Sequence, residues 1–258
     1  KSHTVAVPYL GGVAIVFVFV VVVISLSFTQ YPDEDQTELL TILLLAVGLS
    51  FVGLVDDLRK LSPFWRIGTE IVAATIVWSL GVGVTVTAVG IVDFSLTVLW
   101  IVGITNAFNL LDNMDGLSAG LAAISGLTIF ALAATNKQFL VAGLAIGFVG
   151  CVGGFLRHNF YPARIYMGDG GALFVGFMIS YLGMKLRFDN DRVISALVPV
   201  SACSLAVFDT TIVTVSRLVK RRSPFQGGQD HVSHRLVRIG LPMPVAVSTI
   251  YAAAVGIG

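Results

Sequence analysis

Long apolar runs separated by short polar stretches dominate the chain. The runs lie near residues 7 to 28, 39 to 55, 67 to 81, 96 to 111, 117 to 134, 138 to 156, 171 to 186, 193 to 215 and 241 to 258. Runs of roughly 20 apolar residues can cross the hydrocarbon core of a bilayer as helices. The pattern therefore predicts an all-α, polytopic transmembrane helical bundle with about nine spans. Residues 81 to 95, rich in Val, Thr and Gly, are a candidate for extended structure.

The composition supports a membrane protein. Of the 258 residues, 56% are hydrophobic and 12% are charged, whereas soluble domains carry about 25% charged residues. A net charge of +1 gives no reason to expect a nucleic-acid partner. Cys151 and Cys203 lie in apolar runs without metal-ligand spacing, which predicts buried free thiols.

We expect residues 1–258 to form a single integral membrane domain that is truncated at both ends. Lys1 leads into the first apolar run without an initiator methionine, and the last run stops at Gly258. At least one further span is expected before Lys1.

The Lys and Arg residues predict the orientation. If the Lys1 end is cytoplasmic, twelve of the 16 Lys and Arg residues lie inside, as the positive-inside rule requires. The four residues outside are Lys137, Lys185, Arg187 and Arg192. The cluster near 185 to 192 goes against the rule. In this topology the polar segments around positions 56, 112, 169 and 231 all lie on the cytoplasmic side.

Asp56 and Asp57 end one apolar run. Adjacent carboxylates repel, so they favour a cation or a proton between them, and Arg59 and Lys60 follow within one helical turn. The alternative is a solvated helix end with local ion pairs. An Asp-rich prenyl-diphosphate motif would need an aspartate in place of Lys60.

Asn106, Asn109, Asp112 and Asp115 are spaced three apart at the end of another run. On a helix this spacing keeps them roughly on one face, where they offer oxygen ligands to a hard cation such as Mg²⁺. The alternative is a polar helix end with a turn at Asp115 and Gly116. Unpaired amides inside an apolar run are costly, which favours a binding role.

Two further loops carry candidate phosphate-binding groups. Glycines flank Asp169 just before an apolar run, and such glycines let backbone approach a phosphate at a helix N-terminus, although a simple turn would look the same. The most basic loop ends with His231, His234 and Arg235. These groups can bind phosphate oxygens. For the basic residues before them, a simple role in anchoring the helix at anionic lipid is enough. A metal site at the two histidines is the other alternative.

Taken together, these loops indicate phosphoryl transfer between a soluble nucleotide and a lipid. The sequence resembles the polyprenyl-phosphate N-acetylhexosamine-1-phosphate transferase superfamily (glycosyltransferase family 4), most of all the bacterial undecaprenyl-phosphate N-acetylglucosamine-1-phosphate transferases. The motifs that carry the resemblance are Pro8 to Gly12, Asp56-Asp57, Asn106 to Gly116, Met167 to Asp169 and Asp230 to Leu236.

The resemblance implies a transfer of N-acetylhexosamine-1-phosphate from a UDP-sugar to undecaprenyl phosphate, with release of UMP. It also implies ten or eleven spans in the complete protein, Mg²⁺ that Mn²⁺ can replace, and an active site on the cytoplasmic side of the bacterial inner membrane. The partners are the UDP-N-acetylhexosamine, undecaprenyl phosphate and membrane lipid, and a homodimer is left open.

The same resemblance implies roles for individual residues. Asp169 is the expected metal ligand and Asn109 the amide that assists it. Asp56, supported by Asp57, is expected to deprotonate or orient the lipid phosphate. The remaining expected site residues are Asp112 and Asp115 near nucleotide and metal, His231 and His234 at the diphosphate, and Lys1, Lys60, Asn106 and Arg235 as substrate-binding groups.

The chain departs from the family at Ser233, where the sugar-1-phosphate branch usually has a histidine. The phospho-N-acetylmuramoyl-pentapeptide transferases, an alternative, have three consecutive histidines there, so N-acetylglucosamine is favoured. A CDP-alcohol phosphotransferase would need four spaced aspartates. A polytopic transporter would keep ionisable groups at mid-membrane, and only Glu70 and Asp209 lie clearly inside the expected spans.

Overall fold

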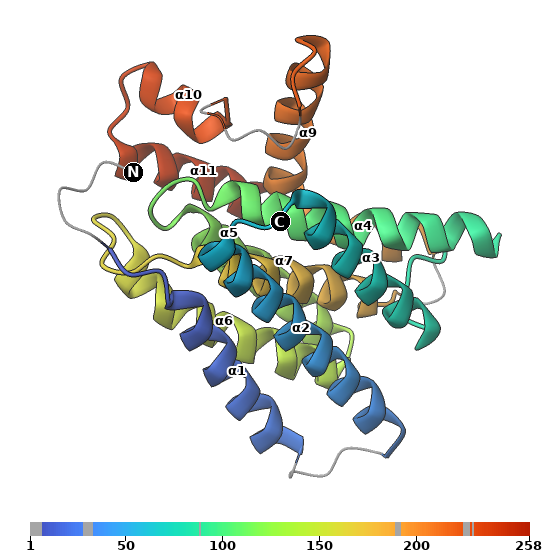
Figure 1. The fold of residues 1–258 in the computed structure, drawn as a ribbon. Coiled ribbons are helices and arrows are strands. Elements are labelled where there is room, and N and C mark those ends of the chain that lie inside the picture. The colour runs from blue at the N-terminus through green and yellow to red at the C-terminus, as the bar shows by residue number, and fades with distance from the viewer. Residues whose placement is uncertain (1–6, 28–32, 88, 189–191, 224–227, 229) are drawn as a thin grey trace.

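The computed structural model describes residues 7–27, 33–87, 89–188, 192–223, 228 and 230–258. Over these residues the protein is built of helices, with no strand (Figure 1). The helices are α1 (Gly11–Ser27), α2 (Asp33–Arg59), α3 (Pro63–Ser79), α4 (Gly90–Leu111), α5 (Leu117–Thr135), α6 (Phe139–Asn159), α7 (Gly168–Lys185), α8 (Arg192–Ala202), α9 (Ser204–Val219), α10 (Val232–Arg238) and α11 (Met243–Ile257). The all-α prediction is therefore confirmed for this part of the chain.

Helix α7 is the core of the bundle. All of its 18 residues except Asp169 and Lys185 are buried. It packs against α1, α2, α4, α5, α6 and α8, and Figure 1 shows it behind α2 in the centre of the view. A helix that is apolar on every side is stable only where neighbours cover it. The neighbours of α7 are therefore held in fixed places around its N-terminus.

Several helices are suited to crossing a membrane. Among the described residues, α2, α4, α5 and α6 are long and apolar enough, and α8 with α9 would make a fifth span if the pair forms one broken crossing. Helices α1 and α11 are apolar but shorter. A polytopic helical membrane protein agrees with these lengths. The predicted number of nine spans is not confirmed, although eight of the apolar runs each overlap one helix and the run near 193 to 215 overlaps both α8 and α9.

The predicted span near 193 to 215 is not a single straight helix. The run is divided into α8 and α9, which are bent by 76° relative to each other. At the break the hydroxyl of Ser125 donates a hydrogen bond of 2.7 Å to the carbonyl oxygen of Ala202. A side chain that takes over a carbonyl of the helical ladder is a common cause of a kink.

The prediction of extended structure for residues 81 to 95 is wrong from Gly90 onward, where α4 begins. The side chain of Asp93 explains the early start. One of its oxygens accepts hydrogen bonds from the backbone N–H and the hydroxyl of Thr87, both at 2.9 Å. A carboxylate in the first turn also favours the helix through the helix dipole.

Glycines bring the backbone of α7 close to its neighbours. A Cβ atom at Gly53 of α2 would lie 2.5 Å from the carbonyl oxygen of Asp169 and 2.6 Å from the nitrogen of Gly170. A Cβ atom at Gly12 of α1 would lie 2.3 Å from the nitrogen of Gly171. Small residues at helix contacts permit this approach. As a result, the end of α2 lies directly beside the start of α7.

We expect Gly53→Ala to destabilise the protein by about 1–3 kcal/mol, because the new methyl group must push α2 away from α7. Gly48→Ala on the same helix is the control, since a Cβ there meets no atom within 4 Å. The control should be neutral or gain up to about 1 kcal/mol from helix propensity. Thermal unfolding of the purified protein in detergent measures both. Equal melting temperatures for the two variants would contradict the tight contact.

Candidate active site

Asp56 lies in the last turn of α2 and closes the turn to α3. Its side chain is buried, and one oxygen accepts a hydrogen bond of 2.5 Å from the backbone N–H of Leu61. The other oxygen lies 2.8 Å from Nη1 of Arg66 in α3. The carboxylate is therefore held from two sides, and Arg66 compensates its charge.

Asp57 caps the N-terminus of α7. Its oxygens accept hydrogen bonds from the backbone N–H groups of Asp169 at 3.1 Å and of Gly170 at 3.3 Å. Unpaired N–H groups at a helix start favour a carboxylate. Gly168 has a φ of 72°, and a Cβ there would lie 2.7 Å from the Asp57 carboxylate. Asp57 thus fixes the backbone at Asp169, and its support of Asp56 stays a prediction.

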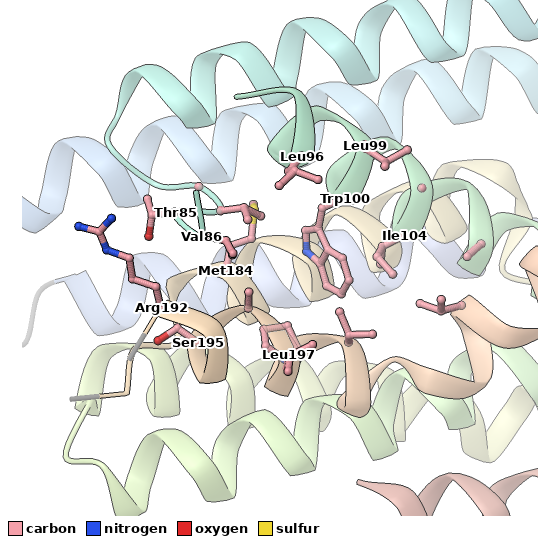
Figure 2. A pocket seen from close by; sticks show the side chains of 18 of the residues that line it. Thr85, Val86, Leu96, Leu99, Trp100, Ile104, Met184, Arg192, Ser195 and Leu197 are labelled. Atoms are coloured by element: carbon pink, nitrogen blue, oxygen red, sulfur yellow. The ribbon is translucent and has the colours of Figure 1, made fainter. Parts of the chain in front are cut away.

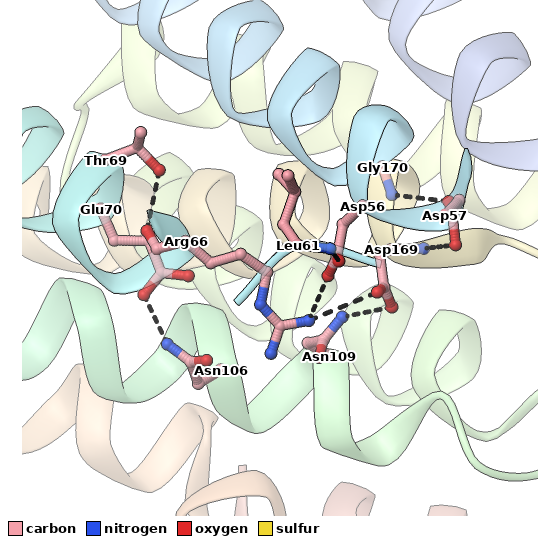
Figure 3. Close-up of polar contacts among 10 residues, drawn as sticks. All are labelled: Asp56, Asp57, Leu61, Arg66, Thr69, Glu70, Asn106, Asn109, Asp169 and Gly170. Atoms are coloured by element: carbon pink, nitrogen blue, oxygen red, sulfur yellow. Dashed lines mark hydrogen bonds and ion pairs between the residues drawn. The ribbon is translucent and has the colours of Figure 1, made fainter. Parts of the chain in front are cut away.

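The Asp169 side chain joins the three helices α2, α3 and α4. Its Oδ1 accepts a hydrogen bond of 2.9 Å from the Asn109 amide. Its Oδ2 lies 3.3 Å from the same Arg66 Nη1 that contacts Asp56. Figure 3 shows the two carboxylates converging on this guanidinium group. The structure thus brings together Asp56, Asp57, Asp169 and Asn109, as the sequence predicts, and adds Arg66.

Asn106 serves a different carboxylate. Its amide donates hydrogen bonds of 2.5 Å to Glu70 of α3 and 2.9 Å to the carbonyl oxygen of Val102. Glu70 is fully buried. Asn106 and Asn109 lie one helical turn apart on α4, so their amides form neighbouring links from α4 to α3 and to α7 (Figure 3). Asn106 thus makes contacts within the protein, and its substrate-binding role stays a prediction.

The expectation that Asp112 and Asp115 share a helical face with the two asparagines is wrong, because α4 ends at Leu111. Asp115 is buried, and its carboxylate accepts a hydrogen bond of 3.0 Å from the backbone N–H of Ala163. Burial raises the pKa of Tyr166, and the charges of Asp115 and Asp112 raise it further. The Asp115 carboxylate therefore holds the loop between α6 and α7, which leads to Asp169.

His231 is buried at the start of α10 and is held by Asp209 of α9. Its Nδ1 lies 2.6 Å from one Asp209 oxygen, and the other oxygen accepts a hydrogen bond of 2.7 Å from the backbone N–H of Val232. Half-buried His234 lies one turn further. Burial lowers its pKa, and the neighbouring His231 and Arg238 lower it further. An ionisable residue inside a membrane helix usually has a partner of this kind.

A second ion pair holds the loop that precedes α10. Arg217 of α9 is buried and binds Asp230 through two hydrogen bonds, of 2.9 Å and 2.7 Å. These bonds lower the pKa of Asp230 to about 2. The backbone carbonyl of Asp230 accepts a hydrogen bond of 2.9 Å from exposed Arg235.

Ser233 links the last loop to the polar end of α4. Its hydroxyl donates a hydrogen bond of 3.0 Å to the side-chain oxygen of Asn113. Ser233, which departs from the family pattern, therefore connects two of the predicted site loops. Of the remaining predicted residues, Lys60 is exposed at the end of α2, and Lys1 lies outside the described residues.

Asp56 and Asp169 are the candidate ligands for a metal ion. No group of three or more His, Cys, Asp or Glu side chains in the described segments could hold a metal ion by itself. However, Asp56 and Asp169 already share one cationic nitrogen, so their oxygens stand where a cation can bridge them. Mg²⁺ is commonly held by one or two carboxylates together with water and substrate phosphates. The donor set thus fits Mg²⁺.

Cys151 and Cys203 are buried free thiols, as predicted.

A mainly apolar pocket lies along α4. It has a volume of about 490 Å³ and is bounded by α4, α7, α8 and α9. Figure 2 shows Leu96, Leu99, Trp100 and Ile104 of α4 along one side of it. The lining also includes Ala107, the residue after Asn106.

The sequence is similar to a family of known transferases. The family model for glycosyl transferase family 4 matches residues 39–187. A probable undecaprenyl-phosphate N-acetylglucosaminyl 1-phosphate transferase of Bacillus subtilis is 33% identical, with 97% of this chain and 71% of that protein covered. A decaprenyl-phosphate N-acetylglucosaminephosphotransferase of Mycolicibacterium smegmatis is 29% identical, with 78% and 57% covered.

A third relative belongs to another branch. A phospho-N-acetylmuramoyl-pentapeptide-transferase of Rubrobacter xylanophilus is 32% identical, with 70% of this chain and 62% of that protein covered. The chain thus spans between 57% and 71% of the length of these three relatives.

We expect Asp209→Asn to loosen the last loop. The loss of the carboxylate charge weakens the bonds to His231 and Val232, and bonds to charged groups contribute about 1.5–3 kcal/mol. Limited trypsin digestion after Lys220 and Arg221 should therefore become faster, on the order of tenfold. Asp93→Asn, which alters another buried carboxylate, should leave this cleavage unchanged. Equal cleavage in wild type and Asp209→Asn would contradict the anchor.

Proposed function

Because the chain belongs to glycosyl transferase family 4, we propose that it transfers N-acetylglucosamine-1-phosphate from a UDP-sugar to undecaprenyl phosphate and releases UMP. The observation that carries the proposal is the convergence of Asp56 and Asp169 on Arg66, with Asn109 beside them. These groups come from four helices, and Asn109 and Asp169 are distant in sequence from Asp56 and Arg66. The named activities of the relatives support the same reaction.

The proposal includes a membrane topology. The nine apolar helical runs cross the bacterial inner membrane, and the site lies on the cytoplasmic side, where twelve of the 16 Lys and Arg residues are expected. A soluble nucleotide sugar and a lipid phosphate can meet there. The reaction is then a first membrane step of cell-wall or surface-polysaccharide synthesis.

The reaction is an attack by a phosphate oxygen of the lipid on the β-phosphorus of the UDP-sugar. The bond from the β-phosphorus to the bridging oxygen breaks, and UMP leaves. Phosphate monoesters are already ionised near neutral pH, so the protein mainly has to align the reactants and compensate charge. A Mg²⁺ ion held by Asp169 and Asp56, or Mn²⁺ in its place, would neutralise charge on the diphosphate.

The protein groups divide this work. Asp57 fixes the backbone of Asp169, and Asn109 orients its carboxylate. His231, held by Asp209, and His234 are proposed to contact the diphosphate on the side of the last loop. Arg235 and Lys60, together with Lys1, are proposed phosphate contacts, and Asp112 and Asp115 are proposed to lie near the nucleotide.

The apolar pocket suits the lipid substrate. It is lined mainly by aliphatic side chains and reaches Ala107 of α4, one residue from Asn106. We propose that it receives isoprenoid units of undecaprenyl phosphate while the phosphate group points toward Asp56. Apolar surface buried there would contribute about 25 cal/mol per Å².

Two alternatives remain for comparison. A phospho-N-acetylmuramoyl-pentapeptide substrate is supported by one relative, but Ser233 interrupts the histidines of that branch. A transporter would use its buried ionisable groups along a pathway. Here Glu70 and Asp209 each bind a predicted site residue, Asn106 and His231, which favours an enzyme.

Asp169→Asn should abolish UMP release from UDP-N-acetylglucosamine in the presence of undecaprenyl phosphate, with at least a hundredfold loss. Removal of divalent cations with a chelator should have the same effect on the wild type, and added Mg²⁺ or Mn²⁺ should restore it. Asp93→Asn lies about 24 Å along α4 from Asn109 and should retain activity. Wild-type rates in Asp169→Asn would remove this carboxylate from the mechanism.

Exchange of labelled UMP separates direct attack from a two-step route through a phosphorylated aspartate. With direct attack, label should not enter UDP-N-acetylglucosamine when no lipid acceptor is present. The lipid-linked product, added to a parallel sample, should allow exchange through the reverse reaction and serves as the positive control. Exchange without any lipid would establish the two-step route instead.

A further inference from the structure

We infer that Arg66 is a movable internal cation, which occupies the divalent-cation site while that site is empty and moves to Glu70 when a divalent ion enters. The inference rests on the metal site of the proposed function. In this scheme Glu70 determines how readily the Arg66 guanidinium leaves the site. Glu70 thereby sets the affinity of the site for the divalent ion.

The first state is the one in the structure. Arg66 Nη1 lies 2.8 Å from Asp56 and 3.3 Å from Asp169. Two carboxylates this close repel, so a positive charge between them lowers their energy. The guanidinium group thus occupies the position that the donor set offers to Mg²⁺. Both cations cannot be there at once, because they repel each other and compete for the same oxygens.

The second state is prepared on the same helix. Glu70 follows Arg66 by four residues on α3, the spacing at which side chains of opposite charge pair on a helix. It is fully buried. Figure 3 shows its carboxylate beside the Arg66 side chain, on the side away from Asp56 and Asp169. In the inferred exchange, the Arg66 side chain rotates about its own bonds from one acceptor to the other.

Incomplete bonding on both partners supports this movement. Glu70 Oε2 accepts the hydrogen bond from Asn106, whereas Oε1 is buried and has no hydrogen-bond partner within the described part of the chain. Arg66 Nε is likewise buried without a partner there. Unsatisfied buried polar atoms of charged groups are expensive. A direct Arg66 to Glu70 pair would satisfy both atoms, and Asn106 already holds Glu70 in place to receive the guanidinium.

The test is the Mn²⁺ affinity of the whole purified protein without substrates, measured by the electron paramagnetic resonance signal of free Mn²⁺. Glu70→Gln should weaken binding about tenfold, because the displaced Arg66 loses its acceptor. Arg66→Gln should bind Mn²⁺ more tightly, because the competing cation is gone. In the Arg66→Gln background, Glu70→Gln should change the affinity less than twofold. Glu38→Gln, at the other end of α2 and paired with Lys185, is the control and should match the wild type.

The double variant decides between a movable and a static arginine. If Glu70 acts only through its fixed charge, Glu70→Gln weakens binding equally with and without Arg66, and that result overturns the inference. An unchanged affinity in Glu70→Gln also overturns it. If Glu70→Gln does not fold, Glu70→Asp is measured in both backgrounds, and its loss of affinity must again depend on Arg66. If the protein is an active transferase but the effect of Glu70 on Mn²⁺ affinity does not depend on Arg66, the movement of Arg66 is refuted and the proposed function is left intact.

Discussion

Like charges that lie close together repel, and the packing of α2 against α7 imposes this situation on Asp56 and Asp169. The glycine contact at Gly53 brings the two helix ends together, and Arg66 offsets the resulting charge. A site that must compensate two carboxylates is suited to binding a cation. The same cation then attracts the phosphates of a substrate. The chemistry thus depends on one tight contact between helices.

The rest of the site supports this pair. The Asp57 carboxylate fixes the start of α7, and the Asn109 amide fixes the orientation of Asp169. On the other side, Asp209 holds His231, and Ser233 bonds to Asn113 at the end of α4. The last loop is therefore attached both to α9 and to the loop after α4. Such fixed side chains lower the reorganisation needed when charge is transferred.

Much of this arrangement could be predicted from the sequence. Hydropathy located every long helix, and the residue types of Asp56, Asp169 and Asn109 identified the site because charged groups in apolar runs need partners. Contacts across helices could not be predicted. Nothing in local spacing shows that Arg66 reaches two carboxylates, or that Ser125 takes the carbonyl of Ala202 at the bend. Short polar segments such as α10 also lack the periodicity that reveals a helix.

The central claim is that carboxylates from α2 and α7 form one divalent-cation site. Anomalous scattering from crystals of the protein soaked in Mn²⁺ tests it most directly. We expect a single strong peak about 2.0–2.6 Å from oxygens of both Asp56 and Asp169, with the guanidinium of Arg66 no longer between them. A peak bound by Asp112 or the histidines alone, or a structure that separates Asp56 from Asp169, would contradict the claim.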